Sequence, residues 1–588
     1  MKVNRNILWT SIFVDELVKQ DIHHVCISPG SRNTPLIYSF AVNKKIKTYV
    51  HIDERVSGFF ATGLARAINK PVVIVCTSGT ATAELYPAII EAYQQRIPLI
   101  VCTADRPGRL RFLGANQTIN QPNLYKNHIR KYFDLDLPDL SIDRLNLLKS
   151  TAYNAVNISS TIDKGPVHIN FPFEKPFEPD AYTDIFNPNI LKELSFVETY
   201  KNISKKEIRS VNSHLNQIID LIKKRKKVLL IAGPDISDFE FSNQIYKLST
   251  LINCPIFADA ASNLRFGEID NKNIIINYDA MLRSKNISKK IKPELILQFG
   301  RIITSKSLED YIAELNIPRY MINEYGDWFD PANKSIASIK MEPIIFCSEI
   351  IRILEDNSFE RRENKWTKNL LLLDEKINIL KSELISHSKF PNEPRITNEL
   401  LKTIPTGSNI MIGNSMPIRD FDYFANKYES EFNIFNNRGA SGIDGIVSTA
   451  LGIAIESLKP TFLLIGDLSF YYDLNSLLIA KQLKIPLIII LINNDGGGIF
   501  EVLPIAKYKD VFSTFFKASP QLEFNSIVKG FGGFYKRVNS WVDFRSNIIN
   551  AIKRKSFSVI EIKTDSKKSL ALRKKFWEAV KSEMKNNF

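Results

Sequence analysis

The chain has 588 residues, with 78 Lys and Arg against 63 Asp and Glu, and 44% of its residues are hydrophobic. This composition excludes a disordered or fibrous polymer, and the length predicts three or four compact units. The longest uninterrupted apolar run covers only residues 485–492, whereas a membrane-spanning helix needs about 20 residues. Asp15 and Glu16 interrupt the first apolar stretch, which argues against a secretory signal. We therefore expect a cytoplasmic protein without a membrane segment.

The formal net charge of +15 admits nucleic acid, a membrane surface or small anions as partners. The surplus lies in helix-like polar stretches such as 223–227 (KKRKK), without aromatic residues between the charges as a stacking platform. We expect a solvated basic surface and no nucleic-acid partner. The five cysteines form no CxxC pair and the histidines no HExxH motif. Buried free thiols are therefore expected, and a zinc site of Cys and His is not.

Short apolar runs alternate along the chain with longer segments of helical periodicity, which is typical of parallel-sheet α/β domains. A Pro-rich stretch at 171–180 and a charged stretch around 361–365 interrupt this alternation. We predict three α/β domains, at 1–180, 195–360 and 370–588. In chain order, the expected strands lie at 24–27, 72–76, 99–102, 228–231, 255–258, 295–299, 462–465 and 487–492.

The first and last thirds of the chain repeat one arrangement of elements. Gly63 is followed eight residues later by Pro71, and Gly452 is followed eight residues later by Pro460. In each third a strand comes next, and another proline follows after 27 residues in the first third and 26 in the last. The spacing predicts that the first and last domains are copies of one α/β unit.

Polar residues at strand ends are the candidates for chemistry, because open parallel sheets bind ligands beyond the carboxyl ends of their strands. Gly466 and Asp467 end one strand of the last domain, and Asn494 ends the next, 27 residues after Asp467. One strand–helix–strand crossover fits this interval, so the carboxylate and carboxamide oxygens should converge. With the Gly496 carbonyl, two diphosphate oxygens and one water, they would complete the octahedral shell of Mg²⁺. The alternative is that Asp467 only caps a helix.

Three further loops carry polar residues of interest. Glycines at 496–498 would let a phosphate approach the backbone, but Glu501 stands where a dinucleotide motif needs its last glycine, and no phosphate-loop lysine follows. Glu54 precedes a helix, where a charged residue is also explained by the helix dipole. Arg419 and Arg438 lie near the expected diphosphate site. They suit substrates that carry carboxylates, because guanidinium pairs bidentately with carboxylate.

Together these motifs resemble the thiamine diphosphate-dependent enzymes. The resemblance covers the first and last domains almost completely and is thin in the middle domain, where it rests on 299–306. The matching segments are 27–36 (ISPGSRNTPL), 51–65 (HIDERVSGFFATGLA), 77–92 (TSGTATAELYPAIIEA), 103–107 (TADRP), 114–121 (GANQTINQ), 413–420 (GNSMPIRD), 436–445 (NNRGASGIDG), 466–477 (GDLSFYYDLNSL) and 493–500 (NNDGGGIF).

The resemblance implies thiamine diphosphate with Mg²⁺ or Mn²⁺ as cofactors. It implies that Glu54 is catalytic and hydrogen-bonds N1′ of the aminopyrimidine, and that Ile443 lies under the cofactor and holds its V shape. The metal ligands implied are Asp467, Asn494 and Gly496. The cofactor-binding residues implied are Glu54, Asn414, Ile443, Gly466, Asp467, Leu468, Ser469, Asn494, Gly496 and Ile499.

Within this family the loops are most similar to those of members that decarboxylate 2-oxoglutarate and add the product to isochorismate in menaquinone biosynthesis. Both substrates are dianions, so five cationic side chains would face four carboxylates. The resemblance also implies a homodimer, possibly a homotetramer, in which Glu54 of one subunit faces Asp467 of the other. The substrate-binding residues implied are Ser31, Arg32, Arg106, Gln117, Lys306, Ser415, Arg419, Arg438 and Phe500.

Two alternatives stay open from the sequence. An acetolactate synthase-like or 2-oxoacid decarboxylase-like enzyme would use the same cofactor, but a pyruvate site would be smaller and less cationic. A nucleic-acid-binding protein with a degenerate enzyme fold would explain the charge, although Glu54, Asp467 and Asn494 argue against it. The aromatic residues Phe512, Phe515 and Phe516 could either close over the site or pack in the interior.

Overall fold

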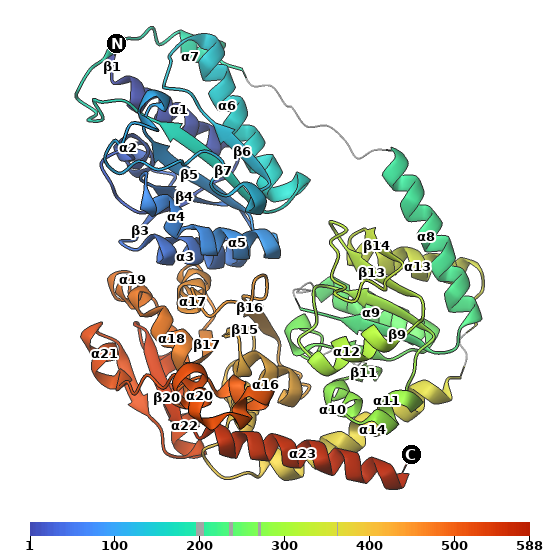
Figure 1. Ribbon diagram of the computed structural model, residues 1–588. Coiled ribbons are helices and arrows are strands. Elements are labelled where there is room, and N and C mark those ends of the chain that lie inside the picture. Colours follow the sequence, from blue (N-terminus) through green and yellow to red (C-terminus); the bar gives the residue numbers. More distant parts are fainter. Residues whose placement is uncertain (196–204, 235–238, 268–271, 361–362, 588) are drawn as a thin grey trace.

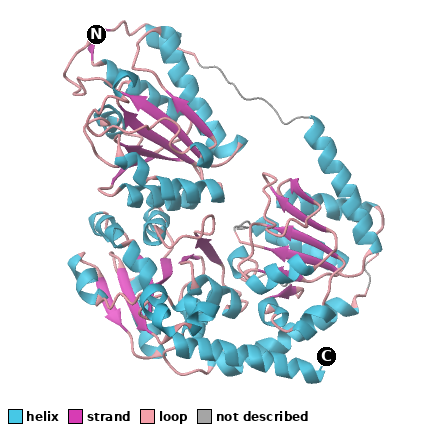
Figure 2. Cartoon of the chain, in the orientation of Figure 1, coloured by secondary structure: helices cyan, strands magenta, loops and turns pink. Residues whose placement is uncertain are grey.

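The computed structural model describes residues 1–195, 205–234, 239–267, 272–360 and 363–587. Within these residues, three six-stranded parallel sheets follow one another along the chain, each covered by helices (Figures 1 and 2). The predicted fold class, three parallel-sheet α/β domains, is confirmed. The predicted domain limits enclose these sheets but stay predictions.

The sheet of the first domain has the strand order β3-β2-β4-β5-β7-β6. Its central strands are continuous apolar runs buried on both faces, as parallel sheets require. The strands are β2 (His24–Ile27), β3 (Lys47–Val50), β4 (Val72–Cys76), β5 (Leu99–Asp105), β6 (Lys131–Asp134) and β7 (Pro166–Pro172). The helices are α1 (Arg5–Lys19), α2 (Thr34–Val42), α3 (Glu54–Ile68), α4 (Thr80–Glu84), α5 (Tyr86–Gln95) and α6 (Ile142–Asn157).

The sheet of the last domain has the order β16-β15-β17-β18-β20-β19, which is the same order counted from the first strand of the domain. Duplication of the first and last domains is therefore visible in their topology. The strands are β15 (Ser408–Ile412), β16 (Phe432–Asn436), β17 (Thr461–Gly466), β18 (Leu487–Asn493), β19 (Phe534–Arg537) and β20 (Ser558–Lys563). The helices are α15 (Glu393–Thr403), α16 (Met416–Phe424), α17 (Ile446–Ile455), α18 (Asp467–Tyr472), α19 (Leu477–Gln482), α20 (Lys509–Val511), α21 (Phe524–Gly530), α22 (Trp541–Ile552) and α23 (Ser566–Asn587).

The middle domain has a different strand order, β11-β10-β9-β12-β13-β14. Counted from its first strand this is 3-2-1-4-5-6, the doubly wound arrangement. Its strands are β9 (Val228–Ala232), β10 (Ile256–Ala258), β11 (Ile274–Ile275), β12 (Leu295–Phe299), β13 (Arg319–Asn323) and β14 (Ala337–Lys340). Its helices are α8 (Lys205–Lys224), α9 (Phe239–Ile252), α10 (Tyr278–Leu282), α11 (Lys285–Lys290), α12 (Lys306–Glu314), α13 (Pro343–Asp356) and α14 (Lys365–Lys381).

Smaller elements complete the description. The antiparallel pair β1 (Lys2–Val3) and β8 (Asp184–Ile185) ties the N-terminus to the end of the first domain, and α7 (Ile190–Glu193) follows. All five cysteines are free and buried, as predicted. Among the described residues, no helix is both long and apolar enough to cross a membrane.

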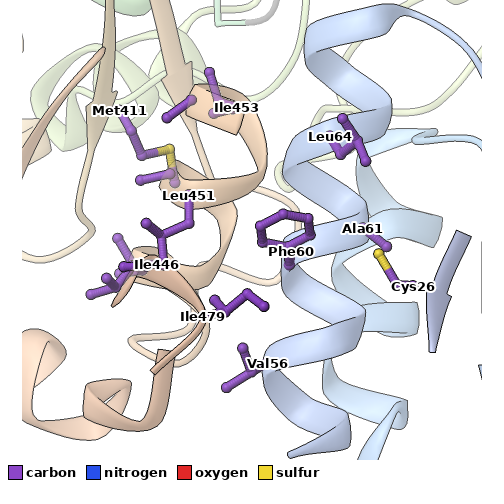
Figure 3. Close-up of a cluster of buried hydrophobic side chains, with 14 of the residues drawn as sticks. Cys26, Val56, Phe60, Ala61, Leu64, Met411, Ile446, Leu451, Ile453 and Ile479 are labelled. Carbon is purple, nitrogen blue, oxygen red and sulfur yellow. The ribbon is translucent and has the colours of Figure 1, made fainter. Parts of the chain in front are cut away.

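Helices α3 and α17 join the first and last domains through one hydrophobic core, to which Phe60 and Leu451 contribute (Figure 3). The two helices touch at the glycines that the duplication matched. A Cβ on Gly63 would lie 2.0 Å from the carbonyl oxygen of Thr449, and a Cβ on Gly452 would lie 2.0 Å from that of Phe60. Only glycine permits this close approach, so the repeat spacing marks the contact between the two copies.

Candidate active site

The carboxyl ends of β17 and β18 bring together the predicted metal ligands. The two strands are adjacent and parallel, with Gly466 opposite Ile492. The buried carboxylate of Asp467 accepts hydrogen bonds from the backbone N–H of Leu468 (2.8 Å) and of Gly496 (2.9 Å). Burial raises the pKa of Asp467 to about 6. A cation bound nearby would favour the charged form of this carboxylate. Asp467 also begins α18, as the helix-capping alternative supposed, but its carboxylate reaches across to the β18 loop.

Asn494 presents an unused oxygen at the same edge of the sheet. Its side-chain amide nitrogen donates to Oε1 of Glu393 (2.9 Å), which leaves Oδ1 buried without a hydrogen-bond partner. Glu393 is itself held by the guanidinium of Arg573 at 2.6 Å. The sequence analysis missed Glu393, because it lies 101 residues before Asn494 and no motif connects the two.

The donor set fits a hard cation, since it offers a carboxylate, an unpaired carboxamide oxygen and a backbone carbonyl. No group of three or more His, Cys, Asp or Glu side chains able to hold a metal occurs among the described residues. The three oxygens offered here would fill half of an octahedral shell, and diphosphate oxygens and water would have to supply the rest.

The glycines after Asn494 also serve packing. Gly496 has φ +125°, and a Cβ on it would lie 2.1 Å from the carbonyl oxygen of Lys517. The N–H of Gly497 donates to that same oxygen (2.7 Å). The segment Phe512–Lys517 thus lies against the glycine loop, in addition to any approach of phosphate that the glycines permit.

The aromatic side chains of this segment divide between packing and exposure. The ring of Phe500, predicted to touch substrate, packs edge to face on Phe516 with centroids 5.6 Å apart. Phe512 is buried, whereas Phe515 is 74% exposed. Phe512 therefore packs in the interior and Phe515 faces outward, while Phe516 is half-buried against a predicted substrate residue.

The remaining predicted cofactor residues surround the same edge. Asn414 follows β15, and its amide nitrogen donates to the carbonyls of Asn437 and Gly442, both at 2.7 Å. Its Oδ1 is buried without a hydrogen-bond partner. Ile443 in the loop between β16 and α17 is 38% exposed. Gly466 ends β17, Leu468 and Ser469 lie in the first turn of α18, and Ile499 lies in the 3₁₀ turn Gly498–Val502.

Glu54 is the first residue of α3 and follows β3 in the first domain. Asp53, and not Glu54, caps this helix, because its carboxylate accepts from the N–H of Arg55 (3.0 Å). Burial raises the pKa of Glu54, and the neighbouring charges of Asp53 and Glu84 add to that rise. The helix-dipole explanation therefore suits Asp53, while the environment of Glu54 is that of a group able to share a proton.

Two predicted arginines of the first domain lie near one another. Arg32 donates to the carbonyl of Phe173 (2.7 Å), and Arg106 donates to the hydroxyl of Ser78. Burial lowers the pKa of Arg32, and the positive charge of Arg106 lowers it further. Gln117 donates to the carbonyl of Ser78 (3.2 Å). Ser78 was not predicted as a site residue, but it contacts both Arg106 and Gln117, which were. Ser31 is exposed beside Arg32.

A second pair of arginines forms in the last domain. Arg419 donates to the carbonyl of Ser415 (2.7 Å), which itself has φ +73° at the start of α16. Burial lowers the pKa of Arg419, and Arg438 adds to this effect. Nε of Arg438 is buried without a hydrogen-bond partner. Each pair concentrates positive charge at strand ends, which favours an anionic ligand.

Lys306 stands apart from these groups. It begins α12 in the middle domain, and its ammonium pairs with Glu309 (3.0 Å) and Asp310 (2.9 Å) of the same helix. Its side chain is 66% exposed. The contacts of Lys306 in this chain are therefore those of a helix surface, and a role in binding substrate stays a prediction.

Comparison with known families shows that the chain is a thiamine pyrophosphate enzyme. Family models match residues 9–124 (thiamine pyrophosphate enzyme, N-terminal TPP binding domain), 197–412 (middle domain of thiamine pyrophosphate) and 422–562 (thiamine pyrophosphate enzyme, C-terminal TPP binding domain). The fold is similar to benzoylformate decarboxylase from Polynucleobacter necessarius, with a TM-score of 0.70 and 17% identity, covering 96% of this chain and 99% of that one.

Relatives in three bacteria are each named 2-succinyl-5-enolpyruvyl-6-hydroxy-3-cyclohexene-1-carboxylate synthase. That of Bacillus cytotoxicus is 36% identical and covers 98% of this chain and 96% of its own length. Those of Bacillus velezensis and Listeria innocua are also 36% identical, with 98% of each chain covered. The chain therefore belongs to the family of these synthases, within the thiamine pyrophosphate enzymes.

Proposed function

We propose that the protein uses thiamine diphosphate and Mg²⁺ to decarboxylate 2-oxoglutarate and join the remaining four-carbon unit to isochorismate. The products would be CO₂ and 2-succinyl-5-enolpyruvyl-6-hydroxy-3-cyclohexene-1-carboxylate, a step of menaquinone biosynthesis in the cytoplasm. The observation that carries this proposal is the identity of 36% over 98% of the chain with synthases of that name. The two arginine pairs support the choice of dianionic substrates over pyruvate.

Thiamine diphosphate supplies the electron sink on which a 2-oxoacid loses CO₂. The carboxyl of Glu54 would hold the proton at N1′ of the aminopyrimidine, and its raised pKa supports that role. Asp467, Oδ1 of Asn494 and the carbonyl of Gly496 would bind Mg²⁺ or Mn²⁺ together with the diphosphate. The unpaired, buried Oδ1 of Asn494 supports this assignment most directly. Ile443 would support the cofactor from below.

The arginines would bind the substrate carboxylates. Arg32 and Arg106, with Gln117 and Ser31, would serve from the first domain, and Arg419 and Arg438, with Ser415, from the last. Phe500 would line the pocket. The side chain of Lys306 would have to give up its ion pairs with Glu309 and Asp310 to reach the substrate. Burial first, and then the neighbouring arginine, lowers the pKa of Arg32 and of Arg419, and the negative charge of a bound dianion would offset both effects.

The functional unit would be a homodimer, possibly paired into a tetramer. Glu54 and Asp467 belong to different domains of the chain, and the family resemblance implies that Glu54 of one subunit faces Asp467 of the other. Each dimer would then hold two sites, each built from the first domain of one subunit and the last domain of its partner.

The test is to incubate the purified protein with Mg²⁺, thiamine diphosphate, 2-oxoglutarate and isochorismate, and to follow CO₂ release and the succinylated acid by mass spectrometry. The proposal predicts both products in equal amounts, and none when either cofactor is omitted. A parallel reaction with pyruvate as donor is the control for the acetolactate synthase-like alternative. A preference for pyruvate over 2-oxoglutarate would replace the proposed function with that alternative.

A further inference from the structure

The loop between β16 and α17 carries Arg438 and Ile443, and the first domain of the same chain holds it in place. Figure 1 shows α5 of the first domain facing the end of β16 across the domain boundary. The amide nitrogen of Gln95 donates to the carbonyl of Asn436 (2.9 Å), and Nη1 of Arg66 donates to the same oxygen (2.6 Å). The start of the loop is thus fixed by side chains from α3 and α5.

Glu91 makes the more specific contact. Its carboxylate, on a residue only 3% exposed, accepts two hydrogen bonds from consecutive backbone N–H groups. Oε1 accepts from Gly439 (2.8 Å) and Oε2 from Ala440 (2.7 Å). A buried carboxylate that receives two N–H donors binds them more strongly than a neutral acceptor would. A Cβ on Gly439 would lie 2.8 Å from the carbonyl oxygen of Glu91, so the loop backbone lies directly on α5.

Arg438 is held on both sides by these contacts. On one side, Asn414 donates to the carbonyl of Asn437, and the side chain of Asn437 donates to Thr449 (3.0 Å). On the other side, Glu91 fixes the next two backbone N–H groups. Arg438 is the one residue between these two anchors, Asn437 and Gly439. Its guanidinium lies close enough to Arg419 to add to the lowering of the pKa of Arg419. The backbone that sets the direction of Arg438 is therefore defined by Glu91 from outside its own domain.

We propose that Glu91 is a positioning residue for substrate binding, which acts by fixing the backbone beside Arg438 so that its guanidinium faces the substrate carboxylate. This inference rests on the proposed function, because it takes Arg438 to be a substrate ligand. Glu91 would thus serve the site that holds Arg438 of its own chain, whereas Glu54 of the same first domain would serve the other site of the dimer.

The variant Glu91→Gln keeps the size of the side chain but sets an NH₂ group against one of the two N–H donors.

The matched control is Glu456→Gln. Glu456 also connects the first and last domains, by accepting from the hydroxyl of Tyr49 (2.5 Å), but it does not touch the loop 436–445. In hydrogen–deuterium exchange of the purified protein, Glu91→Gln is expected to speed exchange in peptides covering 436–445, and Glu456→Gln is not.

Kinetics separate positioning from simple loss of structure. Arg438→Ala is expected to raise the KM of one dicarboxylate, and Glu91→Gln should raise the KM of the same substrate by ~10-fold, as loss of a hydrogen bond to a charged group does. In the double variant the effects should not multiply, because Glu91 acts through Arg438. Glu456→Gln should leave both KM values within ~2-fold of wild type, whatever its thermal midpoint.

The outcomes are distinguishable. If Arg438→Ala raises a KM and Glu91→Gln does not, or if their effects multiply in full, the inference is wrong and the proposed function stands. If Arg438→Ala leaves both KM values unchanged, the substrate role of Arg438 fails and the inference fails with it. Should Glu91→Gln fold poorly, Glu91→Asp takes its place, because the shorter side chain keeps the charge but cannot reach both N–H groups. Unchanged exchange over 436–445 and unchanged KM values in that variant would also overturn the inference.

Discussion

The first and last domains share one strand order and one set of strand ends, yet they carry different chemistry there. After the second strand of the sheet in chain order, the first domain has Glu54 and the last has Arg438. After the third and fourth strands, the last domain has Asp467 and Asn494, whereas the fourth strand of the first domain leads to Arg106. Topology therefore decides where functional residues can lie, and the loop sequences decide which reaction they serve.

The middle domain sharpens this contrast. Its strand order differs from that of the other two, and its one predicted site residue, Lys306, pairs with carboxylates of its own helix. The residues predicted to bind cofactor therefore all come from the duplicated pair. We interpret the two copies as complementary halves, one offering the proton-sharing carboxyl and the other the cation and diphosphate site.

The first way to test the division is to remove the proton-sharing group. Glu54→Gln should lower kcat by ~10²–10⁴-fold, because an amide is a poor partner for the proton at N1′. Cofactor affinity should stay near wild type, since the contacts of the last domain are intact. Steady-state kinetics and cofactor titration measure the two quantities. A variant with wild-type kcat would remove Glu54 from the mechanism.

Removal of the predicted metal ligands should instead weaken the binding of metal and cofactor. Asp467→Ala and Asn494→Ala are each expected to weaken Mg²⁺ and cofactor binding by at least ~10-fold, the usual cost of even an indirect change at a metal site. Calorimetric titration gives both affinities. The control is Asp495→Asn, which changes a neighbouring carboxylate that accepts from Gln521 and is not a proposed ligand. Equal affinities in all three variants would exclude this edge as the cation site.

The contact between the two copies can be broken without touching either set of site residues. Gly452→Ala forces a Cβ onto the backbone of α3 and should destabilise the protein by ~1–3 kcal/mol or more, as overpacking does. Differential scanning calorimetry should show a lower thermal midpoint. Gly530→Ala is the control, because no atom lies within 4 Å of a Cβ at that position. Equal midpoints for the two variants would mean that α3 and α17 are not in close contact.

A smaller effect is expected from pH. The pKa of Asp467 is raised by burial from 3.8 to about 6, so the metal-binding, ionised form predominates only above that value. Mg²⁺ affinity should level off above about pH 7 and fall up to ~10-fold per pH unit below 6, since a proton competes for the ligand. Without metal, the same shift makes the folded protein lose stability as pH rises from 3.8 to about 6. Affinity independent of pH between 5 and 7, measured in the same titration, would contradict the assignment.

Much of the fold could be predicted because it depends on local sequence. Short, mainly apolar runs predicted β2, β4 and β12 residue for residue, and the matched spacing of Gly63 and Gly452 predicted the duplication. The strand-end rule indicated that Asp467 and Asn494 converge, and the structure brings their loops together through Gly496. In each case the pattern lies within one crossover unit.

What could not be predicted depends on contacts between distant segments. Glu393 orients Asn494 from 101 residues away, and Glu91 fixes Gly439 from 348 residues away. Glu393 lies in no matching segment, and the segment 77–92 that contains Glu91 does not reveal its partner, since a buried carboxylate that accepts N–H bonds leaves no periodic signal. The strand order of the middle domain and the pairing of Phe500 with Phe516 are unpredictable for the same reason.

A mixed dimer can show whether the first domain of one subunit and the last domain of the other complete each site. Glu54→Gln and Asp467→Ala, each inactive alone, are expressed together with different tags, and the heterodimer is purified and assayed. In a shared-site dimer one site receives both changes and the other receives neither. About half of the wild-type activity per dimer is then expected, or less if the sites are coupled. A heterodimer no more active than either parent would contradict the shared-site arrangement, because sites built within one chain would each keep one change.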